Sequence, residues 1–514
     1  MARLALLSVS NKTGLIDLAR TLVAEFEFEI ISSGGTATAL KEAGIPVTKV
    51  AEYTGSPEIL GGRVKTLHPR IHGGILARRD VPQDLTDLTD NQIRAIDLVA
   101  VNLYPFEQTI SKPDVSLADA IEQIDIGGPA MLRASAKNHD HLTVLCDPEQ
   151  YNTYLEELRK NSGETSLEFR QKCALATFQH TANYDRAIAD YLSGKFTPES
   201  TAGAQFNLSG KEQQTLRYGE NPHQNATWYQ TGTTPTGWTT SSILQGKELS
   251  YNNLVDLEAA RRLIAEFPDT PAAAILKHTN PCGTALGTTL AEAYQKAFDT
   301  DSVSAFGGIV ALNRPIDPAT ATALTQTFLE CIVAPGCESE AEAIIKKKPK
   351  VRVLILPDLT QRPAQTVKII AGGFLAQDSD NIIETTSTWR AVTEKQPTAE
   401  ELAELLFAWK VAKHVKSNAI VVTRDRTTIG IGAGQMNRVG SVKIALEQAA
   451  EKSQGAILAS DGFFPFDDCV KTAAAAGITA IVQPGGSMRD RDSIEAANQL
   501  GITMMFTDIR HFLH

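Results

Sequence analysis

The chain has 514 residues, of which 42% are hydrophobic and 21% charged, an ordinary globular composition with room for several domains. Its formal net charge of -11 argues against nonspecific binding to nucleic acid or anionic membranes. The six cysteines form no Cys-x-x-Cys pair, so we expect free thiols and a cytosolic setting. The N-terminal apolar run is too short for a signal peptide, and no uncharged apolar stretch reaches transmembrane length.

The first 150 residues alternate short β-branched runs with amphipathic segments, which predicts a parallel sheet with helices on both faces. The expected strands are Leu4–Val9, Phe28–Ile31, Val47–Val50, Leu98–Asn102 and Leu142–Cys146. The expected helices are Thr13–Glu25, Thr36–Ala43, Leu117–Ile124, Pro148–Lys160 and Ser166–Leu192. We therefore predict a doubly wound α/β domain over residues 1–194, with a helical extension, and a linker at 195–205 that is rich in small and turn-forming residues.

Residues 206–514 are again of α/β type, and two stretches within them resemble each other weakly. A helix at Leu290–Phe298 precedes a strand at Ser304–Leu312, and a helix at Val442–Glu451 precedes Gly455–Ser460 and Gly462–Phe466. This similarity suggests two duplicated subdomains, at about 206–370 and 371–514, although strand–helix units also recur by chance. The basic run at 346–350 is interpreted as a solvated loop.

Small polar residues follow the first two expected strands, at Ser8–Lys12 and Ser32–Thr36. In a parallel sheet both turns lie at the carboxyl edge, where glycines and helix N-termini can hold a phosphate. The alternative interpretation, that these residues only cap helices, is about as probable from the pattern alone. A third segment, Gly61–Gly74, brackets cations and histidines between glycine pairs, and it suits a loop that wraps a ligand better than a core element.

Asp125 stands before a Gly-Gly turn, where it is either a helix cap or a general base beside Lys65 and Lys137. In the second region, Lys277-His278 follows the apolar strand Ala272–Leu276 and precedes an expected Pro-Gly turn. Such a pair combines a cationic donor with a base of near-neutral pKa. Catalysis by the thiol of Cys282 is disfavoured because no pattern around it stabilises a thiolate.

Two runs of the first region, Arg63–Pro69 and Asp125–Pro129, resemble the bifunctional AICAR transformylase/IMP cyclohydrolase family of purine biosynthesis. Segments of the second region extend the resemblance to essentially the whole chain: Arg217–Gln224, Lys277–Gly283, Ser304–Gly308, Lys416–Ala419, Gly430–Arg438, Asp461–Asp468 and Arg510–His514. It implies a first domain similar to methylglyoxal synthase and a second region of two domains similar to cytidine deaminase. The deaminase zinc signature is absent from the sequence, so we expect no catalytic metal.

The resemblance implies formyl transfer from the co-substrate 10-formyltetrahydrofolate to AICAR, then dehydrative closure of formyl-AICAR to IMP. It also implies a homodimer with small-molecule substrates and no nucleic-acid or membrane partner. The alternatives are a nucleotide-binding regulatory protein, which needs neither of the two lysine-containing sets, and a zinc deaminase, which the missing zinc ligands disfavour.

The implied roles divide between the two activities. For ring closure the implied catalytic residues are Lys65, Tyr104, Asp125 and Lys137. The implied binding residues there are Ser10, Lys12, Ser33, Gly34, Gly35, Thr36, Arg63, Thr66, Asn102 and Gly127. For formyl transfer the implied catalytic residues are Lys277, His278 and Asn418. The implied binding residues there are Arg217, Tyr218, Phe306, Gly307, Gln435, Arg438, Phe463, Pro465, Asp468 and Arg510.

Overall fold

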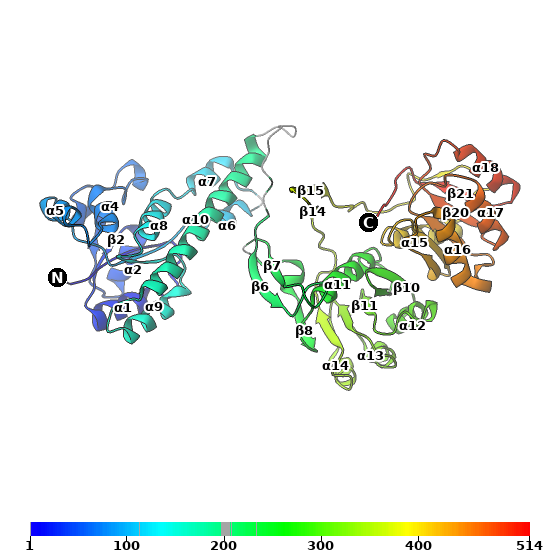
Figure 1. Ribbon diagram of the computed structural model, residues 1–514, viewed down its shortest axis with the longest axis horizontal. Helices are drawn as coiled ribbons and strands as arrows, with labels where there is room; N and C mark the ends of the chain where they lie inside the picture. Colours follow the sequence, from blue (N-terminus) through cyan, green and yellow to red (C-terminus); the bar gives the residue numbers. More distant parts are fainter. Residues whose placement is uncertain (1, 113, 197–205, 207, 233) are drawn as a thin grey trace. The chain divides into compact units, whose positions relative to one another are not determined.

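The computed structural model describes residues 2–112, 114–196, 206, 208–232 and 234–514 (Figure 1). The chain separates into two compact units, residues 1–205 and 206–514. Of the expected linker, residues 197–205 lie outside the described residues, and Lys195 and Phe196 belong to the last helix of the first unit. No helix in the described part of the chain is long and apolar enough to cross a membrane.

The first unit contains a five-stranded parallel sheet in the order β3-β2-β1-β4-β5, which confirms the doubly wound prediction. Its strands are β1 (Leu4–Val9), β2 (Glu29–Ser32), β3 (Thr48–Lys49), β4 (Leu98–Asn102) and β5 (Thr143–Leu145). All residues of β4 are buried, as expected for a central parallel strand that is covered on both faces. The helices are α1 (Leu15–Phe26), α2 (Gly34–Glu42), α3 (Val50–Thr54), α4 (Pro69–Leu76), α5 (Pro82–Asp90), α6 (Phe106–Ile110), α7 (Leu117–Glu122), α8 (Gly127–Lys137), α9 (Gln150–Lys160) and α10 (Leu167–Phe196).

The second unit is built on one twelve-stranded mixed sheet, in the order β16-β21-β20-β19-β17-β18-β10-β9-β11-β12-β13-β8. Its first half contains β8 (Ser242–Gln245), α11 (Tyr251–Ile264), β9 (Ala272–Lys277), β10 (Asn280–Leu286), α12 (Leu290–Thr300), β11 (Ile309–Leu312), α13 (Pro318–Leu324), β12 (Cys331–Ala334), α14 (Ser339–Ile345) and β13 (Arg352–Ile355). Its second half contains β16 (Arg390–Ala391), α15 (Ala399–Ala412), β17 (Ile420–Arg424), β18 (Thr427–Gly432), α16 (Arg438–Ala449), β19 (Ile457–Ser460), α17 (Asp468–Ala475), β20 (Ala480–Gln483), α18 (Asp490–Gln499) and β21 (Thr503–Phe506).

The two halves repeat the same succession of elements and the same strand order, so the expected duplication is confirmed. They meet at the centre of the sheet, where β10 pairs antiparallel with β18. Matching glycines let a helix approach a strand in each half: a Cβ on Gly283 would lie 1.9 Å from the Ala297 carbonyl oxygen, and one on Gly430 would lie 1.9 Å from that of Ala445. The expected strand at Ser304–Leu312 begins only at Ile309, because Ser304 bonds back to Asp301 in a turn.

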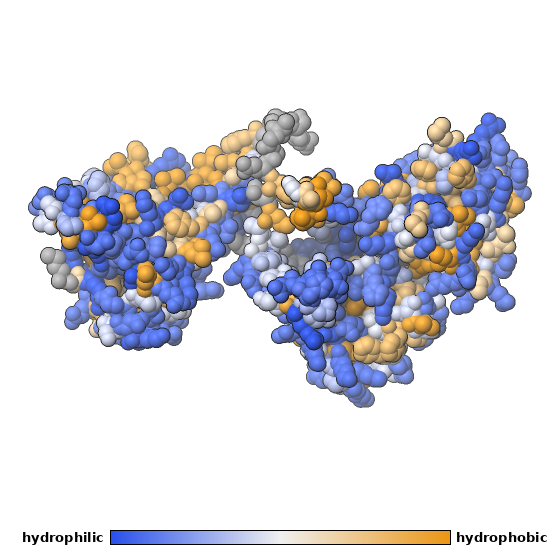
Figure 2. Space-filling view, viewed as in Figure 1, coloured by the Kyte–Doolittle hydropathy of each residue, from blue (hydrophilic) through white to orange (hydrophobic). Residues whose placement is uncertain are grey.

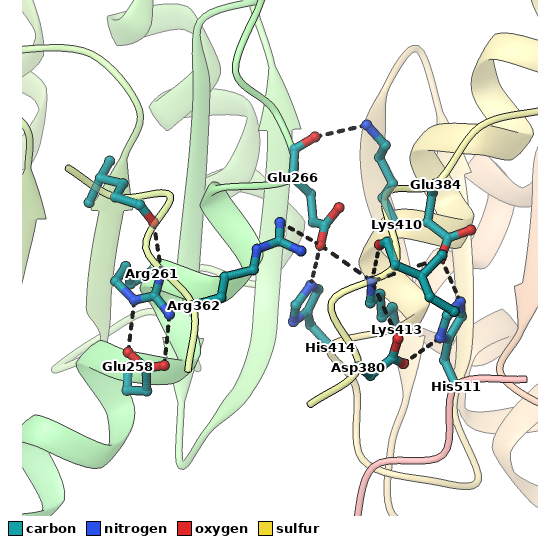
Figure 3. A network of polar contacts seen from close by, with 12 residues as sticks. Glu258, Arg261, Glu266, Arg362, Asp380, Glu384, Lys410, Lys413, His414 and His511 are labelled. Carbon is teal, nitrogen blue, oxygen red and sulfur yellow. Dashed lines mark hydrogen bonds and ion pairs between the residues drawn. The ribbon is translucent and has the colours of Figure 1, made fainter. Parts of the chain in front are cut away.

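A buried cluster of charged side chains joins the two halves (Figure 3). Lys413, the residue that follows α15, lies 3.7 Å from Glu266, just after α11, and 3.8 Å from Glu384 in the connecting segment. His511 in the C-terminal segment contacts Asp380 at 2.5 Å and Glu384 at 2.8 Å. Burial alone lowers the pKa of His511, but the hydrogen bonds that its ring N–H groups donate to these two carboxylates, together with their negative charges, outweigh burial and raise that pKa above its ordinary value. The cluster therefore ties the C-terminal segment to both halves.

Two antiparallel hairpins lie outside the large sheet: β6 (Lys211–Leu216) with β7 (Ala226–Gln230), and β14 (Gln365–Ile370) with β15 (Gly373–Asp378). The tip of the second hairpin exposes apolar side chains and forms an orange patch in Figure 2, made of Ile369, Ile370, Phe374 and Leu375. A two-stranded hairpin that packs on nothing else is only marginally stable in water.

Candidate functional site

A cleft of about 610 Å³ opens at the carboxyl ends of β1, β2 and β4, where the turn sequences predicted a ligand site. The start of α8 and the segment after α3 complete its walls. Most residues assigned to the ring-closing site line this cleft: Ser10, Lys12, Ser33, Gly34, Gly35, Thr36, Arg63, Lys65, Thr66, Asn102, Tyr104, Asp125 and Gly127. The fold therefore brings together segments that lie more than 100 residues apart.

One end of the cleft is suited to an anion. Helix α2 begins at Gly34, and Ser33 at its N-cap makes no side-chain capping bond, so the first-turn N–H groups remain available. A Cβ on Gly34 would lie 3.5 Å from the Lys65 Nζ, and one on Gly35 would lie 3.7 Å from the Lys12 Nζ. Two ammonium groups and a helix N-terminus thus converge, an arrangement that favours a phosphate group.

Two predicted binding residues contribute by holding the backbone. The Asn102 side-chain oxygen accepts hydrogen bonds from the N–H groups of Ser10 (2.6 Å) and Asn11 (2.8 Å). The Thr36 hydroxyl bonds to both backbone groups of Val9 at 3.0 Å. Both side chains are buried, so their contacts shape the turn after β1.

Asp125 lies just before α8 and is half-buried in the wall of the cleft. Its Oδ1 accepts the Gly128 N–H at 2.8 Å, so it caps the helix as the sequence allowed. Its own N–H donates to the Tyr184 hydroxyl at 2.8 Å, so α10 supports the site from behind. Burial raises the pKa of the Asp125 carboxyl, and the bonds from Gly128 and Tyr104 only partly offset this. A carboxylate with a raised pKa is a better proton acceptor, so both interpretations of Asp125 fit the geometry.

Lys65 is placed by close contacts with glycine. A Cβ on Gly62, whose φ is 92°, would lie 2.7 Å from the Lys65 Cε, so a side chain there would displace the lysine. Glu58 lies 3.5 Å from the Lys65 Nζ and is its nearest acidic partner. The lysine is therefore held partly buried in the cleft with its charge balanced.

Lys137 does not lie in this cleft. It ends α8, ten residues beyond the end that faces the cleft, and a helix rises about 1.5 Å per residue. It lines a separate cavity of about 660 Å³ with Arg133, His139 and Phe178. Within one chain the length of α8 therefore separates Lys137 from Asp125, and the part of Lys137 in their shared proton network stays a prediction.

Several lining residues were not anticipated. The apolar side chains of Leu67, Ile121 and Ile126 are exposed into the cleft, at 41%, 42% and 61%. Such surfaces suit the face of a flat heterocycle. Arg63 forms an ion pair with Glu122, with one N–H···O distance of 3.2 Å. Leu67, inside the Arg63–Pro69 run, and Ile126, next to the Gly-Gly run, had a sequence signal that could have found them, whereas Ile121 had none.

In the second unit, Lys277 ends β9 and pairs with Asn280, the first residue of β10. His278 and Thr279 form a two-residue hairpin turn with φ values of 51° and 64°. The expected Pro-Gly turn is wrong, because Pro281 and Gly283 lie inside β10, where a bulge accommodates them. His278 is exposed at the tip of this turn.

The Lys277 ammonium donates to the Phe306 carbonyl at 2.7 Å, and a Cβ on Gly307 would lie 3.3 Å from its Nζ. Phe306 itself is 59% exposed. The structure thus brings together Lys277, His278, Phe306 and Gly307, with an aromatic face open for stacking. Cys282 is buried, and burial raises the pKa of its thiol to about 12, which leaves little thiolate at neutral pH.

A second loop group adjoins the turn, since the Asn280 side-chain oxygen accepts the Lys416 N–H at 3.0 Å. The Asn418 amide donates to the Gln435 carbonyl at 2.8 Å and accepts from Arg438 at 2.7 Å. Arg438 is buried and paired with Asp461, so its direct role is to order these loops.

The remaining assigned residues are less tightly connected. Arg510 stacks on Phe512, and a Cβ on Gly462, next to Phe463, would meet the Phe512 ring. Pro465 and Asp468 follow on the same segment. Among the described residues, Arg217 and Tyr218 contact each other but make no hydrogen bond or ion pair with the Lys277 turn. In the same part of the chain, no group of three or more His, Cys, Asp or Glu is arranged to hold a metal ion.

A parallel α/β unit with a cleft suited to an anion, followed by a duplicated unit with a Lys-His turn, is typical of an enzyme with two centres. Residues 14–130 match the MGS-like domain, and residues 135–448 match the AICARFT/IMPCHase bienzyme. The bifunctional purine biosynthesis protein PurH of Nostoc punctiforme is 75% identical over the full length of both chains, and that of Trichormus variabilis is 74% identical over the full length of both. A crystal structure of ForH, 36% identical, covers 38% of this chain and 100% of its own, with a TM-score of 0.35. The chain belongs to the AICARFT/IMPCHase bienzyme family.

Proposed function

We propose that this enzyme transfers a formyl group from 10-formyltetrahydrofolate to AICAR in the second unit and closes formyl-AICAR to IMP in the first. The observation that carries the proposal is the single cleft that unites Lys65, Asp125 and an anion-binding helix start. The sequence identity of 75% to the PurH relative of Nostoc punctiforme, over the full length of both chains, supports the same pair of activities.

For ring closure, the phosphate would bind at the start of α2 beside Lys12. The carboxamide nitrogen attacks the formyl carbon of the same molecule, so proximity is already covalent. Asp125, whose pKa is raised by burial, would take the proton from that nitrogen. Lys65 would stabilise the developing oxyanion and protonate it to a hydroxyl. That hydroxyl leaves as water with the second proton, returned by Asp125, as the nitrogen that carried the formyl group loses its own proton and the ring C=N bond forms. Tyr104, also in the cleft, would complete the proton network.

For formyl transfer, the exocyclic amine of AICAR attacks the formyl carbon of the folate, and tetrahydrofolate leaves. His278 would accept the proton that the amine loses. Lys277 would stabilise the tetrahedral oxyanion or protonate the folate nitrogen as it leaves. Asn418 would orient the formyl group, and Phe306 would stack on a flat ring of either substrate.

We also propose a homodimer in the cytosol. The exposed apolar tip of the β14–β15 hairpin supports the dimer, because patches of this kind are commonly covered by a partner. Placing the hairpin in an interface predicts that Leu375→Lys lowers the mass measured by light scattering.

The direct test supplies the purified chain with AICAR and 10-formyltetrahydrofolate and follows tetrahydrofolate and IMP. We expect His278→Ala to lower formyl transfer by about 10²- to 10⁴-fold while closure of supplied formyl-AICAR continues. Lys65→Ala should do the reverse. Equal loss of both activities in a folded variant would contradict the two-site assignment.

A further inference from the structure

We infer that Asp256 is a positioning residue for formyl transfer, because its carboxylate holds the Lys277–Asn280 turn in the conformation that presents Lys277 and His278. The inference rests on the proposed transfer site. Asp256 lies on α11, outside every segment that the sequence marked as functional. Its Oδ1 accepts the Thr279 N–H at 2.7 Å.

The turn needs the hydrogen bond to Asp256 because its backbone conformation is unfavourable. Both central residues, His278 and Thr279, have left-handed φ values, which favour glycine and are rare for a β-branched residue such as Thr279. Such residues persist only where the surrounding structure holds them in place. A two-residue turn of this type usually carries Asn-Gly, and here a chemically active pair replaces it.

The hydrogen bond from Asp256 opposes this cost directly. Its acceptor is a half-buried carboxylate, and bonds from backbone N–H groups to charged oxygens are among the stronger ones in proteins. Asp256 meets the turn from behind, while Lys277 is held on another side by the Phe306 carbonyl. Loss of Asp256 would free the turn to relax, and the Lys277 and His278 side chains would move with it.

The second half of the duplicated unit contains the equivalent hydrogen bond, from a turn N–H to a carboxylate on a helix. In the second half, the β17–β18 turn also has two left-handed central residues, Asp425 (53°) and Arg426 (49°). The Arg426 N–H donates to the Glu404 Oε2 at 2.7 Å. Glu404 is the sixth residue of α15 and Asp256 is the sixth of α11, counted from Ala399 and Tyr251. The fold therefore clamps both turns in the same way.

Only one of the two clamped turns carries a lysine and a histidine, at Lys277 and His278. Glu404 is thus a matched control: its carboxylate accepts the same kind of turn N–H at the same distance and is more deeply buried, but it holds a turn that the proposed reaction does not use. A purely structural role predicts equal effects of the two acids on catalysis, whereas a positioning role predicts unequal ones.

The experiment measures kcat and KM for AICAR in the full-length chain, with closure of formyl-AICAR as an internal control. We expect Asp256→Ala to lower kcat for transfer by about 10- to 100-fold with little change in KM, because misplacing a catalytic group mainly costs rate. Asp256→Asn should restore most of the rate, since its amide oxygen can accept the same N–H. Glu404→Ala should lower the melting temperature but leave kcat for transfer near the wild-type value.

A second variant keeps the inference testable if Asp256→Ala alone does not fold. Glycine adopts the left-handed conformation without strain, so Thr279→Gly added to Asp256→Ala should recover transfer. The inference is overturned if Asp256→Ala keeps the wild-type kcat, if Glu404→Ala is equally impaired, or if neither Asp256→Asn nor added Thr279→Gly recovers the rate. If the wild-type chain lacks transfer, or His278→Ala retains it, the proposed function fails instead.

Discussion

The two units each hold a lysine beside a glycine-containing loop, but they do so in different ways. In the first unit, Lys65 lies in a cleft whose walls come from strand ends, a helix start and a long loop. In the second, Lys277 stands at the end of a buried strand, beside His278 on an exposed two-residue turn. The first site thus gathers its candidate residues along the walls of one cleft, while the second gathers them around an exposed turn. The difference teaches that a lysine can be positioned either by the ends of several elements or by a single hairpin turn.

The two halves of the second unit are joined by the buried charged cluster around Lys413. We therefore expect the largest effect on stability from a change of this lysine. Replacing it by Met leaves Glu266 and Glu384 facing each other without their shared cation. We expect the free energy of unfolding of the second unit to fall by about 3–5 kcal/mol. Calorimetry would measure this, with the first unit's transition unchanged. The exposed pair Lys471–Asp467 provides the control, and Lys471→Met should cost less than about 1 kcal/mol.

The first unit's cleft depends instead on close backbone packing. A Cβ on Gly128 would lie 2.5 Å from the Asp125 Oδ2 and 2.7 Å from Leu103. Gly128→Ala should therefore displace Asp125 and slow ring closure by about 100-fold, with formyl transfer unaffected. Kinetic assays of both reactions would test this. Gly194→Ala is the control, because a Cβ there meets nothing within 4 Å; equal loss in both variants would remove the proposed role of this packing.

A smaller effect should appear in the pH dependence of stability of the second unit. The pKa of His511 is raised, so its protonated form stabilises the fold. That contribution is complete below the ordinary pKa of 6.5 and is lost as pH rises through the higher folded value. The stability difference between the wild type and His511→Gln should thus shrink as pH rises above 6.5 and through the raised folded pKa. A constant difference across this range would show that the cluster acts through packing alone.

The smallest expected change in stability concerns Asp125. Because burial raises its pKa, the charged carboxylate is less stable in the folded chain; this penalty grows as pH rises above the ordinary pKa of 3.8 and is complete above the folded pKa. Asp125→Asn should therefore be at least as stable as the wild type at neutral pH while ring closure is lost. In the wild type, kcat/KM for closure should rise with pH through that raised pKa. A variant that is both less stable and fully active would contradict the assignment of Asp125 as the base.

The amino-acid sequence by itself determined the parallel first sheet and the edge at which its ligand site lies. Alternating strands and helices require parallel neighbours, and the turns after β1 and β2 then meet at one edge whatever the details of packing. The sequence likewise pointed to the duplication of the second region and to the Lys277-His278 pair. These features follow from local patterns that repeat along the chain.

Only the tertiary structure decided which side chains meet. It placed Lys137 at the far end of α8, moved the turn from Pro281–Gly283 to His278–Thr279, and buried Arg438 against Asp461. It also assembled the charged cluster around Lys413 from segments separated by more than 100 residues. Local sequence encodes an element and its direction, whereas the partner of a charged side chain depends on how distant elements pack, because only there are both groups withdrawn from water.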